Sequence, residues 1–366
     1  MDNDHIKLLQ KLVSFDTVTP ASIEAVRYCK ELLDSWGIET YIHQSGNVPN
    51  LVVYLNRGSE TLCIAGHLDV VVPGNEWTYN PFELTEHAGK LYGRGTNDMK
   101  GPLSSALIAA RDFIKQSSNL SIIILLTGDE EVMTDNGMKS LMEYVNQRYN
   151  NFLIGIIPES CSPRNSGEYI KVGCRGSINV RLISQAPQGH VACTQNNHLH
   201  KFINTVNALV NLRLDSGNND FEPSLLQLTS IDVGNNARNI VPGNITAKFN
   251  IRFNNIRSSA ELKQIVSDLI PEYINVDIST LSEPFIGCSN EWQKKLQTIA
   301  EKSLNKPIGI GTIGGNSDAQ TLHKYMNVVE IGSPLAQAHT TDEFITLSDM
   351  DKLRKLYYDV FVGLSS

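Results

Sequence analysis

The sequence predicts an α/β fold with a smaller α+β domain inserted into it. Up to about residue 175, short apolar runs typical of buried strands alternate with amphipathic helical segments, which is the order of an α/β layer architecture. Beyond that point two runs alternate apolar with polar residues, as half-exposed strands do, and the first pattern returns near residue 284. We therefore expect a main domain of residues 1–175 and 284–366 and an inserted domain of residues 176–283.

Local patterns predict the elements of the first block one by one. Apolar residues at helical spacing predict helices at 4–14, 21–36, 102–116 and 136–148. Apolar runs predict strands at 38–44, 51–55, 61–66, 121–127 and 152–157. The last two runs are continuously apolar, which is typical of strands that are buried on both faces.

The later elements change in character and then change back. In the inserted block, strands at 177–184 and 244–253 enclose a helix near 199–212, and another helix is expected at 259–270. The α/β pattern resumes with a helix at 290–304, a glycine-rich stretch at 311–315 and a strand at 327–332. One domain interrupted by another is the simplest organisation that gives this order.

Composition excludes several classes of protein. The chain has 366 residues, enough for two buried cores, and a net charge of −8 with no basic block, so nucleic acid is not an expected partner. No apolar run reaches about 18 residues, so no membrane span or membrane partner is expected. The six cysteines are scattered and the amino terminus is polar, unlike a signal peptide, which together predict a cytoplasmic protein.

Side chains that can bind metal ions follow four of the predicted strands. They are His67 after 61–66, Glu130 and Glu131 after 121–127, Glu159 after 152–157, and His339 after 327–332. Because ligands gather at the carboxyl ends of strands in open α/β sheets, these residues can converge although they are far apart in the chain. Asp98, in the loop 93–101 ahead of a helix, can join them.

This set of side chains suits a centre with two divalent ions. Imidazoles and carboxylates without cysteine suit zinc, and cobalt or manganese also fit. Two such ions need a bridging carboxylate and lower the pKa of a water bound between them. Of the adjacent pair Glu130 and Glu131, one can act as general base and the other as ligand. Asp69, two residues after His67 on the same side of an extended chain, can orient the imidazole.

Each motif taken alone has an ordinary alternative. The sequence Asp129-Glu130-Glu131 can be a solvated acidic turn, and Gly93-Arg94-Gly95 with Asp98 can be a turn followed by a helix cap. The glycines do not form a dinucleotide-binding fingerprint either. Their joint occurrence at the ends of separate strands is what favours a metal site.

The residues that carry this chemistry also resemble a known family. The string His67-Leu68-Asp69-Val70, followed by Trp77, Pro81-Phe82 and Leu91 to Gly101 (LYGRGTNDMKG), resembles the dizinc aminoacylases. That family includes succinyl-diaminopimelate desuccinylase, acetylornithine deacetylase, aminoacylase and carboxypeptidase G. The likeness runs in order through nearly the whole chain: Asp129-Glu130-Glu131, Pro158-Glu159, Gly189-His190, Asn239 to Gly243 (NIVPG), Gly314 to Asp318 (GGNSD) and Ala338-His339.

The resemblance implies a zinc-exopeptidase-like catalytic domain, with a mixed central sheet and helices on both faces, and an inserted dimerisation or lid domain. It implies two Zn²⁺ ions per subunit, for which Co²⁺ or Mn²⁺ can substitute. One ion would be held by His67, Asp98 and Glu159, and the other by Asp98, Glu131 and His339, with Asp98 as the bridge. Glu130 would be the general base.

The resemblance also implies a homodimer. In it, His190 would stabilise the oxyanion at the active site of the partner subunit. Taken locally, the pair Gly189-His190 is equally well a surface turn.

Within the family, the inserted domain is most similar to the succinyl-diaminopimelate desuccinylases. The similarity implies that Arg175, Ser177, Asn239, Arg252, Gly315 and Asn316 contact the substrate. Arginine suits this role because its planar fork pairs with a carboxylate through two hydrogen bonds. The alternative for Arg252 is a solvated strand residue.

Several positions depart from the desuccinylase pattern. Cys174-Arg175 replaces Arg-Arg, Cys193-Thr194 replaces Tyr-Pro, and Asn316 replaces Thr in the Gly-Gly-Thr-Ser loop. The sequence Gln337-Ala338-His339 with Asp342-Glu343 is closer to acetylornithine deacetylase. Loss of one arginine contact, about 1.5–3 kcal/mol for a charged hydrogen bond, weakens the case for a succinyl carboxylate.

The expected activity is metal-dependent hydrolysis of an N-acyl amide bond on an amino-acid substrate. The main hypothesis is a desuccinylase that converts N-succinyl-LL-diaminopimelate and water to succinate and LL-diaminopimelate, in lysine and cell-wall precursor synthesis. The alternatives are deacetylation of N-acetylornithine or a similar compound in arginine synthesis, and an exopeptidase acting on dipeptides. A metal-binding scaffold without catalysis is a further alternative, against which the intact Glu130 argues.

Overall fold

The structure, a computed structural model, describes residues 3–116 and 119–365. The chain divides into two compact units: unit 1 comprises Met1–Gly173 and Ile286–Ser366, and unit 2 comprises Cys174–Phe285. In the part of the chain that is described, no helix is long and apolar enough to cross a membrane.

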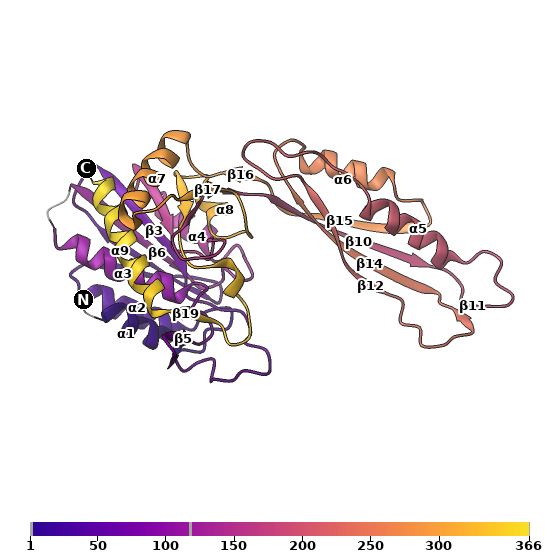
Figure 1. The fold of residues 1–366 in the computed structure, drawn as a ribbon, viewed down its shortest axis with the longest axis horizontal. Coiled ribbons are helices and arrows are strands. Elements are labelled where there is room, and N and C mark those ends of the chain that lie inside the picture. Colours follow the sequence, from indigo (N-terminus) through magenta and orange to yellow (C-terminus); the bar gives the residue numbers. More distant parts are fainter. Residues whose placement is uncertain (1–2, 117–118, 366) are drawn as a thin grey trace. The chain divides into compact units, whose positions relative to one another are not determined.

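Unit 1 is built on one mixed sheet of eight strands (Figure 1). Across the sheet their order is β1 (Glu39–Ser45), β2 (Val48–Leu55), β6 (Leu120–Thr127), β3 (Glu60–His67), β7 (Phe152–Ile157), β18 (Val328–Glu330), β8 (Tyr169–Lys171) and β17 (Gly309–Gly311). The four central strands β6, β3, β7 and β18 are parallel to one another, whereas β2 pairs with β1 and β6 in the antiparallel sense. This arrangement confirms the predicted mixed sheet.

Helices cover both faces of this sheet. Helix α3 (Lys100–Ile114) connects β3 to β6, and α4 (Met138–Val145) connects β6 to β7, which lies on the other side of β3. Because such crossovers are right-handed, the two helices lie on opposite faces, as predicted. Helices α1 (Asp4–Val13) and α9 (Leu347–Leu364) pack on α3, α7 (Asn290–Leu304) packs on α9, and α8 (Ala319–Leu322) packs on α4. Helix α2 (Ile23–Asp34) packs against β1 and β2.

The start of α3 approaches the end of β3 very closely. A Cβ atom on Gly66 would lie 2.8 Å from Met99 Cε and 3.1 Å from Leu103 Cδ1, so a larger residue here would displace the Met99 side chain. The main-chain N–H of His67 donates to Met99 Sδ across the same contact. The residues just before α3, which include Asp98, are thereby held beside His67.

A second, three-stranded sheet brings the carboxyl-terminal region next to this loop. It consists of β4 (Thr85–His87), β5 (Lys90–Tyr92) and β19 (Phe344–Thr346), with β5 in the centre. Strand β19 pairs with β5 in the antiparallel sense, and Gly93 N–H donates to the Glu343 carbonyl just beyond the ladder. The segment that follows the short 3₁₀ helix η1 (Leu335–Gln337) therefore lies against the loop that follows β5.

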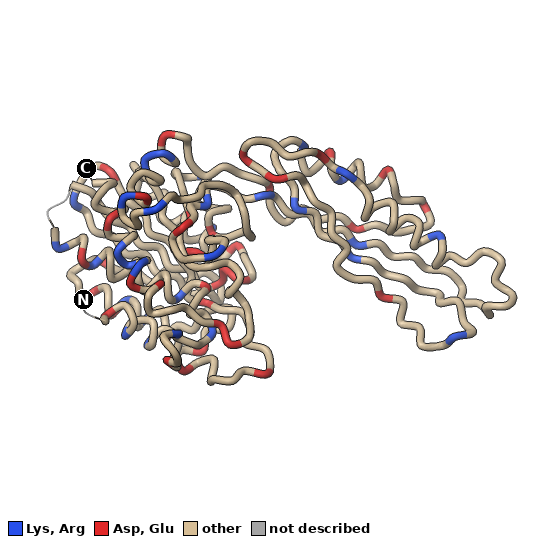
Figure 2. Tube along the Cα trace, viewed as in Figure 1, with Lys and Arg blue, Asp and Glu red and all other residues tan. Residues whose placement is uncertain are grey.

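Unit 2 has its own four-stranded antiparallel sheet. Its order is β12 (Leu225–Asp232), β14 (Asn244–Phe253), β10 (Gly176–Gln185) and β15 (Ile274–Ser282). Helices α5 (His198–Val210) and α6 (Ser259–Asp268) share a hydrophobic core with one face of this sheet. Two short ladders complete the unit: β11 (Gly189–His190) pairs with β13 (Ile240–Val241), and β9 (Gly173–Cys174) pairs with β16 (Phe285–Ile286) at the boundary between the units. Acidic and basic residues are interspersed along both units (Figure 2).

Candidate active site

The central parallel strands of unit 1 bring the metal-binding side chains to one edge of the sheet. His67 is the last residue of β3, and Glu130, Glu131 and Glu159 follow the ends of β6 and β7. Strand β3 connects to β6 on one side, and the chain then returns to β7 on the other side, so this edge is a topological switch point, where α/β sheets bind ligands. His339 joins from beyond η1, several residues after β18 rather than at its end.

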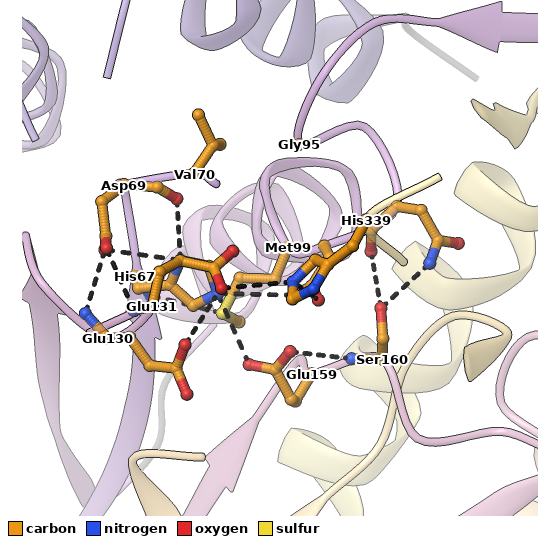
Figure 3. A network of polar contacts seen from close by, with 12 residues as sticks. His67, Asp69, Val70, Gly95, Met99, Glu130, Glu131, Glu159, Ser160 and His339 are labelled. Carbon is orange, nitrogen blue, oxygen red and sulfur yellow. Dashed lines mark hydrogen bonds and ion pairs between the residues drawn. The ribbon is translucent and has the colours of Figure 1, made fainter. Parts of the chain in front are cut away.

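Two groups of three potential ligands meet at this edge and share Asp98. Figure 3 shows how His67, Glu131, Glu159 and His339 gather there. The first consists of His67, Asp98 and Glu159, and the second of Asp98, Glu131 and His339. Within each group the ligand atoms all lie within 4.8 Å of one another.

The two carboxylate oxygens of Asp98 face different groups. Oδ1 lies 3.4 Å from His67 Nε2, and Oδ2 lies 3.3 Å from His339 Nε2. Glu159 Oε2 lies 3.7 Å from His67 Nε2, and Glu131 Oε2 lies 3.2 Å from His339 Nε2. Asp98 is therefore placed to bridge two ions.

The side chains present fit a pair of bound cations. Buried polar atoms in proteins almost always have a hydrogen-bond partner. Among the described residues, four atoms of this cluster are buried without one: His67 Nε2, Asp98 Oδ1, Glu131 Oε1 and Glu159 Oε2. Three of these are carboxylate oxygens that no donor satisfies, which is the environment that a divalent cation stabilises.

Glu130 lies beside both groups without belonging to either. Its Oε2 is 3.9 Å from His67 Nε2, and a third cluster of potential ligands contains His67, Glu130 and Glu131. Its side chain is 10 % exposed, so it is buried next to the candidate ions yet still reaches solvent. That position suits a group that exchanges protons with a water molecule in the site.

Asp69 holds both the histidine and the glutamate pair in place. His67 Nδ1 lies 2.9 Å from the Asp69 main-chain carbonyl and 3.5 Å from its Oδ1, which leaves Nε2 free to face the ligands. The Asp69 carboxylate also accepts hydrogen bonds from the main-chain N–H groups of Glu130 and Glu131, and from the Thr19 hydroxyl. One buried carboxylate thus positions the ends of β3 and β6 together.

The glycine-rich loop after β17 is attached to the sheet by a buried ion pair. Lys171 Nζ donates to Glu330 Oε2 at 2.8 Å and to the Gly315 carbonyl at 2.6 Å, and the Ser317 hydroxyl donates to the other oxygen of Glu330. Lys171 and Glu330 are both 2 % exposed. Gly315 and Asn316, two predicted substrate contacts, therefore lie on a loop with a fixed position in unit 1.

Unit 2 places the other predicted substrate residues in two separate groups. Arg175, Ser177 and Arg252 lie where β10 begins and β14 ends, and Ser177 is paired with Arg252 in the ladder. Ser177 is buried and accepts a hydrogen bond from Asn250, and Arg175 Nη1 donates to the Pro223 carbonyl.

His190 and Asn239 form the second group, at the opposite end of β10. The pairing of β11 with β13 brings them together, and Val191 N–H donates to the Asn239 carbonyl. Both are exposed. The ten residues of β10 separate the two groups by about 30 Å, at about 3.3 Å per residue.

Comparison with known proteins assigns the family. Residues 63–362 match the peptidase family M20/M25/M40. The chain belongs to this family. A curated relative, the succinyl-diaminopimelate desuccinylase of Rickettsia bellii (strain OSU 85-389), is 37 % identical over 372 aligned residues, which cover 97 % of this chain and 95 % of the relative. The M20 chain is accordingly a metal-dependent amide hydrolase.

Solved structures share the M20 fold over the full length. The M20 metallo-carboxypeptidase Sso-CP2 from Sulfolobus solfataricus superimposes with a TM-score of 0.81 at 17 % identity and covers 100 % of this chain and 99 % of its own. The Bacillus subtilis protein YXEP, described as a dinuclear metal-binding M20 peptidase, gives 0.67 at 10 % identity and covers 99 % and 96 %. At such identities the likeness shows the fold alone.

The two ligand groups and Glu130, together called the M20 centre below, carry an excess of negative charge when no cations are bound. Burial lowers the pKa of His67, but Asp69, Asp98, Glu130 and Glu159 around it raise the pKa well above its usual value. Burial raises the pKa of Glu130 and of Glu159, and the neighbouring carboxylates add to this effect. Hydrogen bonds with Asp98 and Glu131 raise the pKa of His339 to about 10.

Two contributors to this site stand in motifs that carry the family resemblance, but the sequence assigned them no role. Asp318, beside α8, is 5 % exposed, and burial raises its pKa to about 8, with Asp69, Asp129 and Glu330 acting in the same direction against His67. Glu343 is fully buried below the Asp98 loop. A single acidic residue has no periodic pattern, so only tertiary contacts could reveal either role.

The pKa shifts in the M20 centre predict how the stability of the protein stripped of metal ions by a chelator depends on pH. The folded pKa values of Asp318 and His339, about 8 and about 10, exceed their ordinary values of 3.8 and 6.5, so the folded state binds more protons than the unfolded state. The stability contributed by Asp318 is lost as the pH rises from about 4 to 8, and that from His339 is lost from about 6.5 to 10. Bound ions require the deprotonated ligands and act in the opposite direction.

We expect the melting temperature of the EDTA-treated protein to fall between pH 6.5 and 9, and the gain on adding Zn²⁺ to increase over the same range. Differential scanning fluorimetry of the two forms measures both. A gain that is constant or shrinks as the pH rises contradicts this electrostatic description of the site.

Proposed function

We propose that this chain is a succinyl-diaminopimelate desuccinylase with two Zn²⁺ ions in each subunit. The observation that carries the proposal is the pair of ligand groups that share Asp98, with Glu130 beside both. The choice of substrate rests on the relative from Rickettsia bellii, which carries that name and aligns over nearly the full length of both chains.

The ligand assignment follows the two groups. His67 and Glu159 would hold one ion, Glu131 and His339 would hold the other, and Asp98 would contribute to both. Ions bound there supply Lewis acidity toward the amide carbonyl and lower the pKa of a bound water. The mixed imidazole and carboxylate donors suit zinc, and Co²⁺ or Mn²⁺ can replace it.

Glu130 is the general base in this proposal. Buried and close to several carboxylates, its side chain has a raised pKa, which moves it toward the range in which a carboxylate accepts and returns protons. It takes a proton from the attacking water and delivers it to the leaving amine. The Asp69 carboxylate fixes the main chain of Glu130, so the base stays aimed at the site.

We propose a homodimer in which His190 serves the active site of the partner subunit. The support comes from unit 2, where His190 and Asn239 lie about 30 Å from Arg175 and Arg252 along β10. A small substrate cannot reach both groups of one chain. If both groups contact substrate, two copies of unit 2 must serve each site. His190 then stabilises the oxyanion, and its exposure in one chain fits a contact made with another molecule.

Substrate choice depends on the loop that carries Gly315 and Asn316 and on the arginines of unit 2. Cys174, which replaces an arginine of the desuccinylase pattern, is buried in β9. Arg175 and Arg252 are then the candidates for a carboxylate contact. Because an acetyl group needs no such contact, N-acetylornithine deacetylation is the second candidate function.

We also infer a cytoplasmic enzyme without nucleic acid or membrane partners.

The substrate proposal is tested by measuring kcat/KM of the zinc-loaded protein on N-succinyl-LL-diaminopimelate and N-acetyl-L-ornithine side by side. One charged hydrogen bond to the succinyl carboxylate, about 1.5–3 kcal/mol, predicts a preference of about 10- to 100-fold for the succinyl compound. A preference for the acetyl compound instead assigns the enzyme to the deacetylases.

The general-base proposal is tested with Glu130→Gln. The variant keeps the shape of the side chain but cannot accept the proton, so we expect kcat to fall by about 10²- to 10⁴-fold. Because Glu130 belongs to neither ligand group, metal analysis is expected to find the same number of ions as in the wild type. Activity near that of the wild type at full metal occupancy rules out this role.

His190→Ala in the same assay is expected to lower kcat by about 10²- to 10³-fold without loss of metal. His200→Ala, an exposed histidine on α5 in the same unit, is the matched control and should leave kcat unchanged. Equal activity of the two variants contradicts the proposed role of His190.

A further inference from the structure

Glu343 is a fully buried carboxylate that is bonded almost entirely to one loop. Its Oε1 accepts hydrogen bonds from the main-chain N–H groups of Asn97, at 2.7 Å, and Asp98, at 2.9 Å. Its Oε2 accepts from Gly95 N–H at 3.0 Å and from Arg94 Nη1 at 2.6 Å. The loop that presents Asp98 is therefore wrapped around a single side chain from a distant part of the sequence.

Arg94 connects the same carboxylate to two further segments. Its guanidinium is 2 % exposed, donates to the carbonyls of Val72, Pro73 and Thr340, and lies over the ring of Trp77. Val72 and Pro73 follow His67 in the chain, and Thr340 follows His339. The ion pair between Arg94 and Glu343 thus joins the loop that carries Asp98 to the segments that follow His67 and His339.

The segment from His339 to Glu343 needs such attachment. His339 and Asp342 both have positive φ, 62° and 54°, in the left-handed region that is unfavourable for residues with a Cβ atom. Pairing of β19 with β5 fixes the main chain directly after Glu343. The Glu343 side chain then connects this turn to the Asp98 loop. As a result, His339 Nε2 stays 3.3 Å from Asp98 Oδ2.

We propose that Glu343, paired with Arg94, is a positioning residue that holds Asp98 and His339 together for the ion bound by Asp98, Glu131 and His339. The inference rests on the proposed two-ion centre. Glu343 itself is no ligand, because its two oxygens are occupied by the loop. Its loss should weaken this second ion most, because two of that ion's three candidate ligands, Asp98 and His339, depend on Glu343. For the first ion only Asp98 depends on it, since His67 ends β3 and Glu159 follows β7.

The chain offers a closely matched control. Glu330 is also a buried glutamate in an ion pair, with Lys171, and its other oxygen accepts from the Ser317 hydroxyl. Its carboxylate is bonded to Lys171 and Ser317 and not to any of the five candidate ligands. Glu330→Gln therefore imposes a similar loss of a buried charge, whereas only Glu343→Gln places an amide among the N–H groups that hold the Asp98 loop.

The test is a titration of the metal-free full-length proteins with Co²⁺. Calorimetry and the visible absorption of the bound cobalt monitor the binding. We expect Glu343→Gln to bind the second ion at least about ten-fold more weakly than the wild type, with a smaller loss of affinity for the first ion, and Glu330→Gln to bind both ions as the wild type does. Arg94→Lys keeps the charge but loses the fork, and is expected to show a smaller loss of the same kind. It serves as the second variant if Glu343→Gln does not fold.

Three outcomes overturn the inference. Wild-type affinity for both ions in Glu343→Gln and Arg94→Lys shows that the ion pair does not position the ligands. Equal losses in Glu343→Gln and Glu330→Gln show a general effect of a buried charge. Both results leave the two-ion centre intact, whereas a wild-type protein that binds fewer than two ions contradicts the centre and the inference together.

Discussion

Concentrated negative charge at one edge of the central sheet is the constraint on which the rest of unit 1 depends. Asp69, Asp98, Glu130, Glu131 and Glu159 gather there, with only His67 and His339 among the potential ligands to oppose them. Buried carboxylates without cations are costly because their charge is no longer solvated by water. Two divalent ions remove this cost, and the atoms left without hydrogen-bond partners mark where they fit.

The fold meets this constraint in two layers. Parallel strands supply the inner layer, since β3, β6 and β7 end at the same edge and each brings a candidate ligand to it. Carboxylates outside the candidate ligand groups supply the outer layer: Asp69 fixes the ends of two strands, and Glu343 fixes the Asp98 loop. Asp69 and Glu343 thus hold the main chain in place. The candidate ligands can therefore direct their lone pairs toward bound ions.

Much of the architecture could be predicted from the sequence, because long apolar runs and helical periodicity are local signals. Those signals predicted the α/β architecture, and the family resemblance correctly implied the mixed sheet with helices on both faces. Helix α9 was missed, although Thr346 caps it and Met350, Leu353, Tyr357 and Phe361 follow at helical spacing. Strand β15 was missed because most of its side chains are exposed, and β4, β5 and β19 are only three residues long.

The site was predictable where ligands directly follow strands, and less so elsewhere. His339 was expected at the end of β18, but it lies beyond η1 and reaches the site through a turn with positive φ. Glu343 could not be recognised, because its partner Arg94 is 249 residues away and the contact exists only once β19 pairs with β5. The roles of the residues in unit 2 stay predictions, since they depend on a substrate and a second subunit.

The central claim is that two ions share Asp98, and counting bound metal tests it most directly. The wild type, Asp98→Asn and His339→Ala are equilibrated with Zn²⁺, passed through a desalting column and analysed by native mass spectrometry. The account predicts two ions per chain in the wild type, one in His339→Ala, and fewer than one in Asp98→Asn, since only Asp98 belongs to both groups. Two ions retained in Asp98→Asn, or a single ion in the wild type, would contradict it.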